Sequence, residues 1–189
     1  MRVFIIVMTA LLSLSAAECH VEKTGDISVQ WTAYKTPSKI GVNGGFRAVN
    51  YQGADHASTL EKLLVGATVQ LQTNNVDSKN SERDAKLVQF FFNLMSGQMI
   101  ETKILSLEGD ATKGKLMLEV ILNRKGKNVP MYYEVKEGVF SAKGVIDLND
   151  HHAMSALKSI TIACYDLHKG KTWNDVSIGF SFNLKEGCK

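Results

Sequence analysis

One stretch of this chain decides the fold: Ser78-Lys79-Asn80-Ser81-Glu82-Arg83-Asp84-Ala85-Lys86-Leu87-Val88-Gln89-Phe90-Phe91-Phe92. It is a dense charged turn that runs straight into three consecutive phenylalanines, and it lies between two stretches typical of β-strands. On a helix, three adjacent phenylalanines spread over most of the circumference, so at least two faces of that helix need apolar cover. We therefore expect a short helix that caps or plugs the interior of a sheet.

Most of the surrounding chain alternates apolar and polar residues, which is typical of antiparallel strands with one face in a core and the other in water. The alternation is clearest over residues 27–33, 67–73 and 176–184. Further strands are expected at 42–49, 100–108, 115–123, 129–136 and 139–147, where turn residues separate several of the segments.

These eight strand segments predict an all-β fold. We expect an eight-stranded antiparallel β-barrel, whose closure removes exposed strand edges. A barrel of that size has room for one small ligand. Short helices are expected at 58–64, 80–95 and 152–162. Ser81 followed by Asp84 resembles a capping pattern in which Ser81 would begin the middle helix.

The first 17 residues have the layout of a secretory signal peptide. Arg2 precedes an apolar run of about ten residues, which gives way to small residues ending at Ala17. That run is shorter than the roughly 20 apolar residues that span a bilayer. We expect cleavage after Ala17, so that residues 18–189 form a single domain with a substantial core. Glu18 argues against a lipid anchor on Cys19, because lipoprotein signals place a small residue before that cysteine.

Charge excludes one class of partner. Removal of Arg2 takes the 22 Lys and Arg to 21 against 19 Asp and Glu, so the net charge falls from +3 to +2. This near-neutral balance gives no electrostatic support for binding nucleic acid.

The three cysteines predict one disulfide and one free thiol in an oxidising compartment. Cys19 and Cys188 lie near the two ends of the chain. The first and last strands of a closed barrel are neighbours, so this pair is one candidate disulfide. Pairing of Cys164 with either end is the alternative, and the sequence leaves both open.

The pattern N-x-E-R-D-x-x-L followed by aromatic residues, in 80–92, resembles the signature segment of the YceI-like family. Members of that family are bacterial periplasmic proteins that bind polyisoprenoids and other long amphiphilic lipids. Similar segments lie at 31–46, 76–92, 115–147 and 176–184. Typical members have N-E-x-R-D where Ser81 intervenes here, and a histidine often found before the leucine is replaced by Lys86. Residues 163–175 are not part of the common pattern.

The resemblance implies a lipocalin-like fold, an elongated barrel covered by a helix and enclosing a hydrophobic tunnel for an isoprenoid or acyl chain. It also implies a periplasmic location and a homodimer. No cofactor, metal or stable membrane insertion is expected. Candidate lipid-binding side chains of the tunnel are Trp31, Val42, Phe46, Val69, Leu71, Phe90, Phe91, Phe92, Leu118, Val120, Met131, Tyr133, Phe180 and Phe182. For any single one of these residues a place in a solid core is the better interpretation, whereas the resemblance favours a cavity for the set.

Arg83 has two candidate roles. Flanked by Glu82 and Asp84, it is expected first to form a structural ion pair that fixes the turn. The alternative is a contact to the phosphate or carboxylate head group of a lipid, because a guanidinium binds such groups bidentately.

Other sequence features give weak signals for chemistry. The five histidines show no H-x-x-x-H or H-E-x-x-H spacing, so no metal site is expected. Cys164 and His168 are four residues apart and would share a helix face, which suggests a thiol nucleophile. A structural thiol is favoured, since no third group is positioned to act with them.

The sequence therefore predicts a non-enzymatic periplasmic protein that holds a long-chain amphiphile in an apolar barrel for transport, storage or sequestration. Two alternatives stay open. One is a lipid-modifying enzyme that uses the same pocket, and the other is a stress-response protein with a dry core that acts through a protein partner.

Overall fold

The computed structural model describes residues 19–188, so the expected signal peptide lies outside the described residues. Eleven strands form one antiparallel sheet. They are β1 (Cys19–Lys35), β2 (Ile40–Phe46), β3 (Asn50–Gln52), β4 (His56–Ala57), β5 (Thr68–Gln72), β6 (Val76–Asp77), β7 (Met99–Gly109), β8 (Lys113–Leu122), β9 (Lys125–Lys136), β10 (Val139–Asp147) and β11 (Thr172–Cys188).

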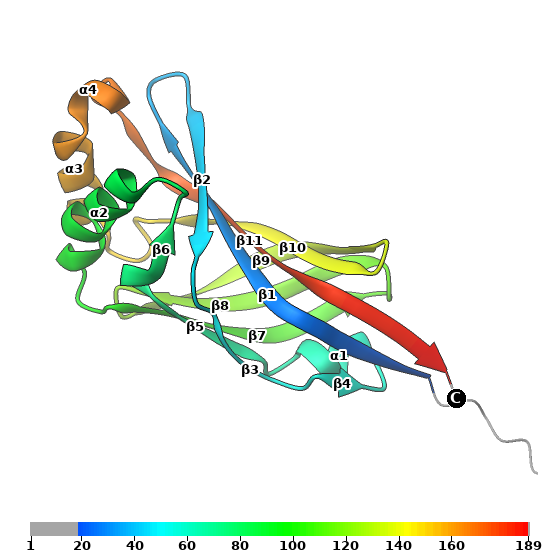
Figure 1. Cartoon of the computed structure of the whole chain (residues 1–189). Coiled ribbons are helices and arrows are strands. Elements are labelled where there is room, and N and C mark those ends of the chain that lie inside the picture. Colours follow the sequence, from blue (N-terminus) through cyan, green and yellow to red (C-terminus); the bar gives the residue numbers. More distant parts are fainter. Residues whose placement is uncertain (1–18, 189) are drawn as a thin grey trace, which may run out of the picture.

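The eight strands of five residues or more are the eight that the sequence predicts, so the all-β antiparallel class is confirmed, although β3 and β6 do not pair to close the sheet. The sequence missed β3, β4 and β6, which have two or three residues each. The sheet order is β3-β5-β7-β8-β9-β10-β11-β1-β2-β6, with β4 added on β1. The sheet curls around its apolar face into a half-barrel, and its two ends are the short strands β3 and β6 (Figure 1).

The longest strands, β1 and β11, lie side by side and hold the two ends of the domain together. Their pairing runs from Cys19 opposite Cys188 to Lys35 opposite Thr172. A disulfide joins Cys19 to Cys188, whose Cα atoms are 4.0 Å apart. Cys164 is the free, buried thiol. The barrel topology thus selects the pairing that links the ends.

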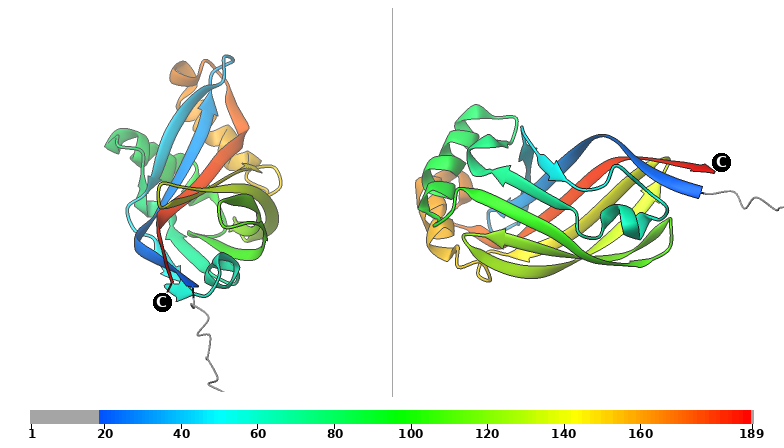
Figure 2. Two further views of the ribbon diagram at one scale, coloured as in Figure 1. Left: turned by 90° about the vertical axis from the view of Figure 1, so that its right-hand side faces the viewer. Right: turned by 90° about the horizontal axis from the view of Figure 1, so that it is seen from below.

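Helices close one end of the curled sheet. The predicted helices are confirmed as α1 (Leu60–Leu64), α2 (Ser81–Phe90) and α3 (Met154–Ala163), and the sequence missed the short α4 (Tyr165–His168). Two 3-10 turns, η1 (Thr73–Asn75) and η2 (Phe92–Leu94), complete the elements, so the helix expected over 80–95 is interrupted after Phe90. Figure 2 shows α2, α3 and α4 gathered at one end of the sheet, away from the C-terminus.

The core lies on the concave face of the sheet. Phe140 of β10 is fully buried, and its ring stacks on Phe182 of β11 at a centroid distance of 4.9 Å and on Tyr133 of β9 at 5.4 Å. These side chains alternate with outward-facing residues, as period-2 strands require. This aromatic cluster covers the concave face of the sheet near the tight Glu137-Gly138 turn. From there, apolar side chains continue along the concave face toward the helices.

Candidate functional site: an apolar cavity in the half-barrel

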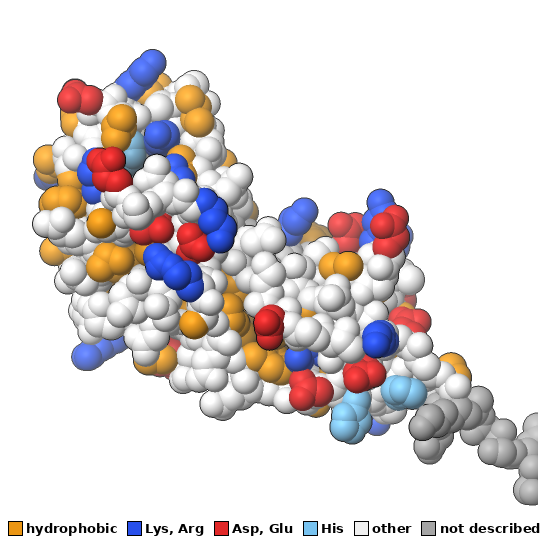
Figure 3. All heavy atoms as spheres, viewed as in Figure 1, with side chains coloured by type: hydrophobic (Ala, Val, Ile, Leu, Met, Phe, Trp, Pro, Cys, Tyr) orange, Lys and Arg blue, Asp and Glu red, His pale blue; other side chains and the backbone are white. Residues whose placement is uncertain are grey.

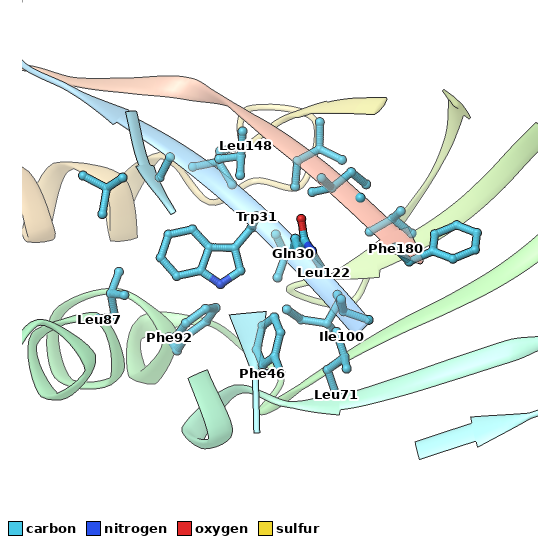
Figure 4. Close-up of a pocket in the computed structure, with 18 of the residues that line it drawn as sticks. Gln30, Trp31, Phe46, Leu71, Leu87, Phe92, Ile100, Leu122, Leu148 and Phe180 are labelled. Carbon is cyan, nitrogen blue, oxygen red and sulfur yellow. The ribbon is translucent and has the colours of Figure 1, made fainter. Parts of the chain in front are cut away.

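A cavity of about 360 Å³ lies between the concave face of the sheet and the helices. Its walls come from all strands except β4 and β6 and from the helices α1, α2, α3 and α4. Figure 4 shows Trp31, Phe46 and Phe92 around one part of it, with Leu71 and Ile100 beside them. A volume of this size falls within the range of small-molecule sites, roughly 300–1,000 Å³.

Twelve of the fourteen side chains expected in the tunnel line this cavity. They are Trp31, Val42, Phe46, Val69, Leu71, Phe91, Phe92, Leu118, Val120, Met131, Phe180 and Phe182. They come from elements far apart in the sequence, and the curl of the sheet brings them together around one space.

Glycines help to keep that space open. Gly44, Trp31, Ile178, Gly144 and Met131 are successive partners across β2, β1, β11, β10 and β9. A Cβ on Gly44 would lie 2.2 Å from the Trp31 ring, and one on Gly144 would lie 2.8 Å from Met131 Cγ. The indole therefore lies flat over Gly44, and its Nε1 donates to the Gly45 carbonyl at 3.2 Å. With its polar group satisfied, Trp31 acts as an apolar wall.

Several large apolar side chains on these walls are only partly buried. Trp31, Phe46, Ile100, Ile178 and Phe180 pack against the closed core but keep accessible surface. All five line the cavity. In a densely packed interior, such side chains would instead be in full contact with their neighbours. Their exposure to an internal space distinguishes this part of the molecule from the closed aromatic cluster around Phe140.

Phe90 does not line the cavity, contrary to the expectation from the sequence. It is the last residue of α2, and it lines a shallow surface groove with Ser159 and Ile162 of α3. Phe91 and Phe92 are buried on the cavity side, with ring centroids 5.1 Å apart in an edge-to-face arrangement. The chain turns at Phe91, which ends α2. Because three consecutive side chains cannot share one face, the first of them packs toward α3 instead.

Tyr133 is the second residue that lies elsewhere. It faces the core but belongs to the closed aromatic cluster, where its hydroxyl donates to the Asp110 carbonyl at 2.7 Å. Burial and the nearby charge of Asp110 raise the pKa of this phenol. The hydrogen bond holds Tyr133 against the β7–β8 turn, beyond the end of the cavity.

Apart from Gln30 and Thr102, the polar side chains that line the cavity lie at two places. At the first, Lys23 lies beside Tyr51. Lys23 Nζ is 5.0 Å from the centroid of the Tyr51 ring, a cation–π contact, and it forms an ion pair with Asp55 Oδ1 at 3.0 Å. The second place, which we call the helical mouth, comprises Tyr34 and Lys35 of β1, Asn80, Glu82, Arg83 and Lys86 around α2, and Leu167, His168, Thr172 and Trp173 around α4. Its charged groups come from β1 and α2 and lie where the helices cover the cavity.

The helical mouth carries positive charge beside a neutral imidazole. His168 Nδ1 lies 2.7 Å from the Thr172 hydroxyl oxygen. Burial, and secondarily the charge on Lys35, lowers the pKa of His168, so the ring is neutral at pH 7. Lys86 pairs with Glu82 at 2.8 Å, and this contact raises the pKa of Lys86. Lys35 forms no ion pair within residues 19–188.

The turn before α2 is organised by Asn80 and Asp84. Asn80 is the N-cap, and its Oδ1 accepts from the Arg83 amide at 2.9 Å, so the capping pattern predicted at Ser81 is displaced by one residue. The buried Asp84 accepts from the amide of Ser78 at 2.8 Å and from its hydroxyl at 2.6 Å. Arg47 reaches the other carboxylate oxygen at 3.5 Å. Asp84 therefore ties α2 to the strand that precedes it.

The ion pair expected for Arg83 is wrong. Glu82 pairs with Lys86 and Asp84 with Arg47, whereas Arg83 donates from Nε to the Ser78 hydroxyl and from one Nη to the Ser78 carbonyl, both at 2.8 Å. Adjacent side chains on a helix do not face each other, so Arg83 is not directed toward its neighbouring acids. Its remaining N–H groups stay at the helical mouth.

We expect Asp84→Ala to lower the free energy of unfolding by about 3 kcal/mol. The substitution leaves the buried Ser78 amide without a hydrogen-bond acceptor and removes the carboxylate that pairs with Arg47. Urea unfolding measures this change. Glu82→Ala is the matched control: it removes another acid from the first turn of α2, but an exposed one whose pair with Lys86 is screened by solvent, so we expect little change. Equal losses in the two variants would contradict the role given to Asp84.

His151, another of the five histidines, has a structural partner. His151 is buried, with Nδ1 2.9 Å from the Lys125 carbonyl. Cys164 and His168 both line the cavity, and the His168 backbone amide donates to the Cys164 carbonyl. Within residues 19–188, no three His, Cys, Asp or Glu side chains converge as metal ligands.

Sequence reasoning missed several lining residues. Val176 and Ile178 share an inward row with Phe180 and Phe182, so the same alternation would have identified them. Leu167, His168 and Trp173 come from the segment 163–175, where no periodic signal marks a lining position.

The comparisons with known proteins identify the family. The family model described as the YceI-like domain matches residues 21–184, which is nearly the whole described chain. The chain belongs to the YceI-like family. No curated protein matches the chain in sequence. In the described part of this YceI-like protein, no helix has the length and apolar character needed to span a bilayer.

Solved structures share the fold at low sequence identity. BcnA of Burkholderia cenocepacia is 11% identical, with a TM-score of 0.59 over 84% of this chain and 96% of that one. A polyisoprenoid-binding domain from Saccharophagus degradans, implicated in plant cell wall breakdown, is 8% identical, with a TM-score of 0.59 over 90% and 99%. The Campylobacter jejuni YCEI protein is 19% identical, with a TM-score of 0.52 over 78% and 85%.

Proposed function

We propose that this YceI-like protein binds a long-chain amphiphile, a polyisoprenoid or fatty-acid-like lipid, with the chain in the apolar cavity and the head group at the helical mouth. The observation that carries the proposal is the set of partly buried aromatic and aliphatic side chains around a cavity of about 360 Å³. The description of the Saccharophagus degradans neighbour as a polyisoprenoid-binding domain supports it.

Affinity would come from apolar burial, at about 0.8 kcal/mol per methylene removed from water. Ten buried methylenes would contribute about 8 kcal/mol before the cost of ordering the chain. This is enough for tight binding without any catalytic group, so we propose carriage, storage or sequestration rather than catalysis. The expected signal peptide and the Cys19–Cys188 disulfide support an oxidising location, and we propose the periplasm.

Native mass spectrometry of protein purified from its own periplasm tests the proposal, followed by denaturation and mass analysis of what is released. We expect a long-chain amphiphile in near-stoichiometric amount and the mass of a homodimer. An apo mass that stays unchanged after incubation with isoprenoid and fatty-acid mixtures would favour a protein that acts through a partner. Chemical conversion of the added lipid would favour an enzyme.

We propose that Arg83 and Lys35 contact an anionic head group at the helical mouth. Replacing Arg83 with Gln removes the charge, so we expect about tenfold weaker binding of farnesyl diphosphate, the loss of one charge-assisted hydrogen bond. Farnesol has the same chain and no charge, so its affinity should not change. Titration with both probes measures the difference, and Lys158→Gln, outside the cavity lining, is the control. An equal loss for both probes would show that Arg83 supports only the turn at Ser78.

A further inference from the structure

The surface next to the helical mouth is apolar and basic. Ile162 of α3 and Tyr165 and Leu167 of α4 are 64%, 64% and 61% exposed, although they lie within six residues of one another. We call these three side chains the rim patch. Figure 3 shows hydrophobic side chains gathered over the helical end of the molecule. Isolated exposed apolar residues need no explanation, whereas a group beside a cavity is typical of an interaction surface.

The rim patch is continuous with the cavity. Leu167 belongs to the patch and also lines the cavity, and its neighbour His168 belongs to the helical mouth. A ligand that enters or leaves through this mouth would pass the patch. This continuity distinguishes the patch from the exposed Tyr132 and Val145, which lie on the strands β9 and β10 and do not line the cavity.

Lysines surround the rim patch. Residues 154–172 hold Lys158, Lys169 and Lys171 against a single acid, Asp166, which is a net charge of +2 with the histidine neutral. The aromatic ring of Trp173, at the mouth, lies under two ammonium groups, Lys171 Nζ at 4.7 Å and Lys39 Nζ at 4.9 Å from its centroid. Lys39 also pairs with Asp175.

The opposite end of the sheet differs. It carries the two ends of the described chain and the tight turns at Asp110 and Glu137 (Figure 1). These turns hold charges of both signs, since Lys113 follows Asp110 and Lys136 precedes Glu137. The helical end, by contrast, combines exposed apolar side chains, aromatic rings and an excess of positive charge. That combination fits the interface of an anionic bilayer, where lysines meet the head groups and apolar tips enter the acyl boundary.

We propose that the rim patch docks the protein on an anionic membrane surface, with the helical mouth facing the bilayer so that the amphiphile passes directly between membrane and cavity. The inference rests on the proposed function, because it assigns the route by which the same cavity is filled and emptied. Docking is peripheral and reversible, since only three apolar side chains insert.

Co-sedimentation with vesicles tests the docking. Wild-type protein should bind vesicles of phosphatidylglycerol and phosphatidylcholine at low salt. Binding should be much weaker on pure phosphatidylcholine, and also at 1 M salt, where the Debye length shrinks to about 3 Å. The test variant is Ile162→Glu/Tyr165→Glu, which leaves the cavity lining intact and should weaken partitioning by about tenfold or more, through lost insertion and added repulsion.

The chain offers a matched control in Tyr132→Glu/Val145→Glu. These side chains are 65% and 56% exposed, are of the same type, and lie on β9 and β10 outside the cavity lining. This control should bind vesicles like the wild type. Equal vesicle binding by the two double variants would overturn the docking surface. Both should keep the wild-type melting temperature.

A second measurement separates docking from ligand binding. Binding of farnesol in vesicle-free buffer should be the same in the wild type and the rim-patch variant. If the wild type binds farnesol but no vesicle, the docking inference fails and the proposed function survives. If it binds neither, the proposed function fails as well. Binding to vesicles of both compositions alike would contradict an anionic surface as the partner.

Discussion

Removing the disulfide by Cys19→Ala/Cys188→Ala is expected to lower the free energy of unfolding by about 2–5 kcal/mol. The bond joins residues 169 positions apart, so it closes almost the entire described chain into one loop. In the chain-entropy model, closing a loop of that length contributes about 5 kcal/mol, near the top of the usual range. Urea unfolding of the variant and the wild type measures the difference.

Reduction and a third cysteine provide the controls. A reductant should bring the wild-type unfolding midpoint to that of the double variant and leave the double variant unchanged. Cys164→Ala removes a buried thiol but keeps the bond, so it should retain the sensitivity to reductant. A loss below about 0.5 kcal/mol in the double variant, within the range of ordinary surface substitutions, would mean that the β1–β11 pairing alone holds the ends.

The disulfide and the cavity mouth lie at opposite ends of the same two strands. Cys19 and Cys188 are paired at one end of β1 and β11, and Lys35 and Thr172, both lining the mouth, are paired at the other. The covalent link therefore fixes the strand register without restricting the end through which we propose that the ligand moves. This arrangement combines a stable wall with an accessible opening.

The strands were predictable because their signal is local. Alternation over five residues or more marks one face of a sheet, and all eight such segments are strands in the structure. The short strands β3, β4 and β6 were missed, since two or three residues cannot show a period. The helix α4 was missed for a similar reason, as its four residues make barely one turn.

The errors at the site arose where a side chain has several possible partners and does not bond to its immediate neighbours. Arg83 was expected to pair with the acids beside it, but Asp84 turns back to Ser78 and meets Arg47, which is 37 residues away. Asn80 and Ser81 are both good N-caps, and the sequence could not choose between them. The side chains around α4 carry no pattern that indicates contact with the cavity, because the curl of the sheet brings them there.

Filling the cavity should have the largest effect on ligand binding. Ala33 of β1 lines the cavity between Val42 and Val176, its partners on β2 and β11. We expect Ala33→Trp to place an indole where the chain of the amphiphile would lie. Displacing about four methylenes would cost about 3 kcal/mol, roughly two hundredfold in Kd. Titration with farnesol, and the amount of lipid that co-purifies, both measure this loss.

The matched control is Thr32→Trp, which adds an indole at the next residue on the outward face, where Thr32 bonds to Asn43 at 2.8 Å. It should bind farnesol like the wild type. The stability of Ala33→Trp then separates a cavity from a dry core. In a filled core the added ring would be overpacked and would cost typically 1–3 kcal/mol, whereas a ring that enters existing space costs little. Weak binding with unchanged stability supports an open cavity that the ligand occupies. Unchanged binding with lost stability would contradict it, because the ring would then have met a wall of side chains where the cavity is placed.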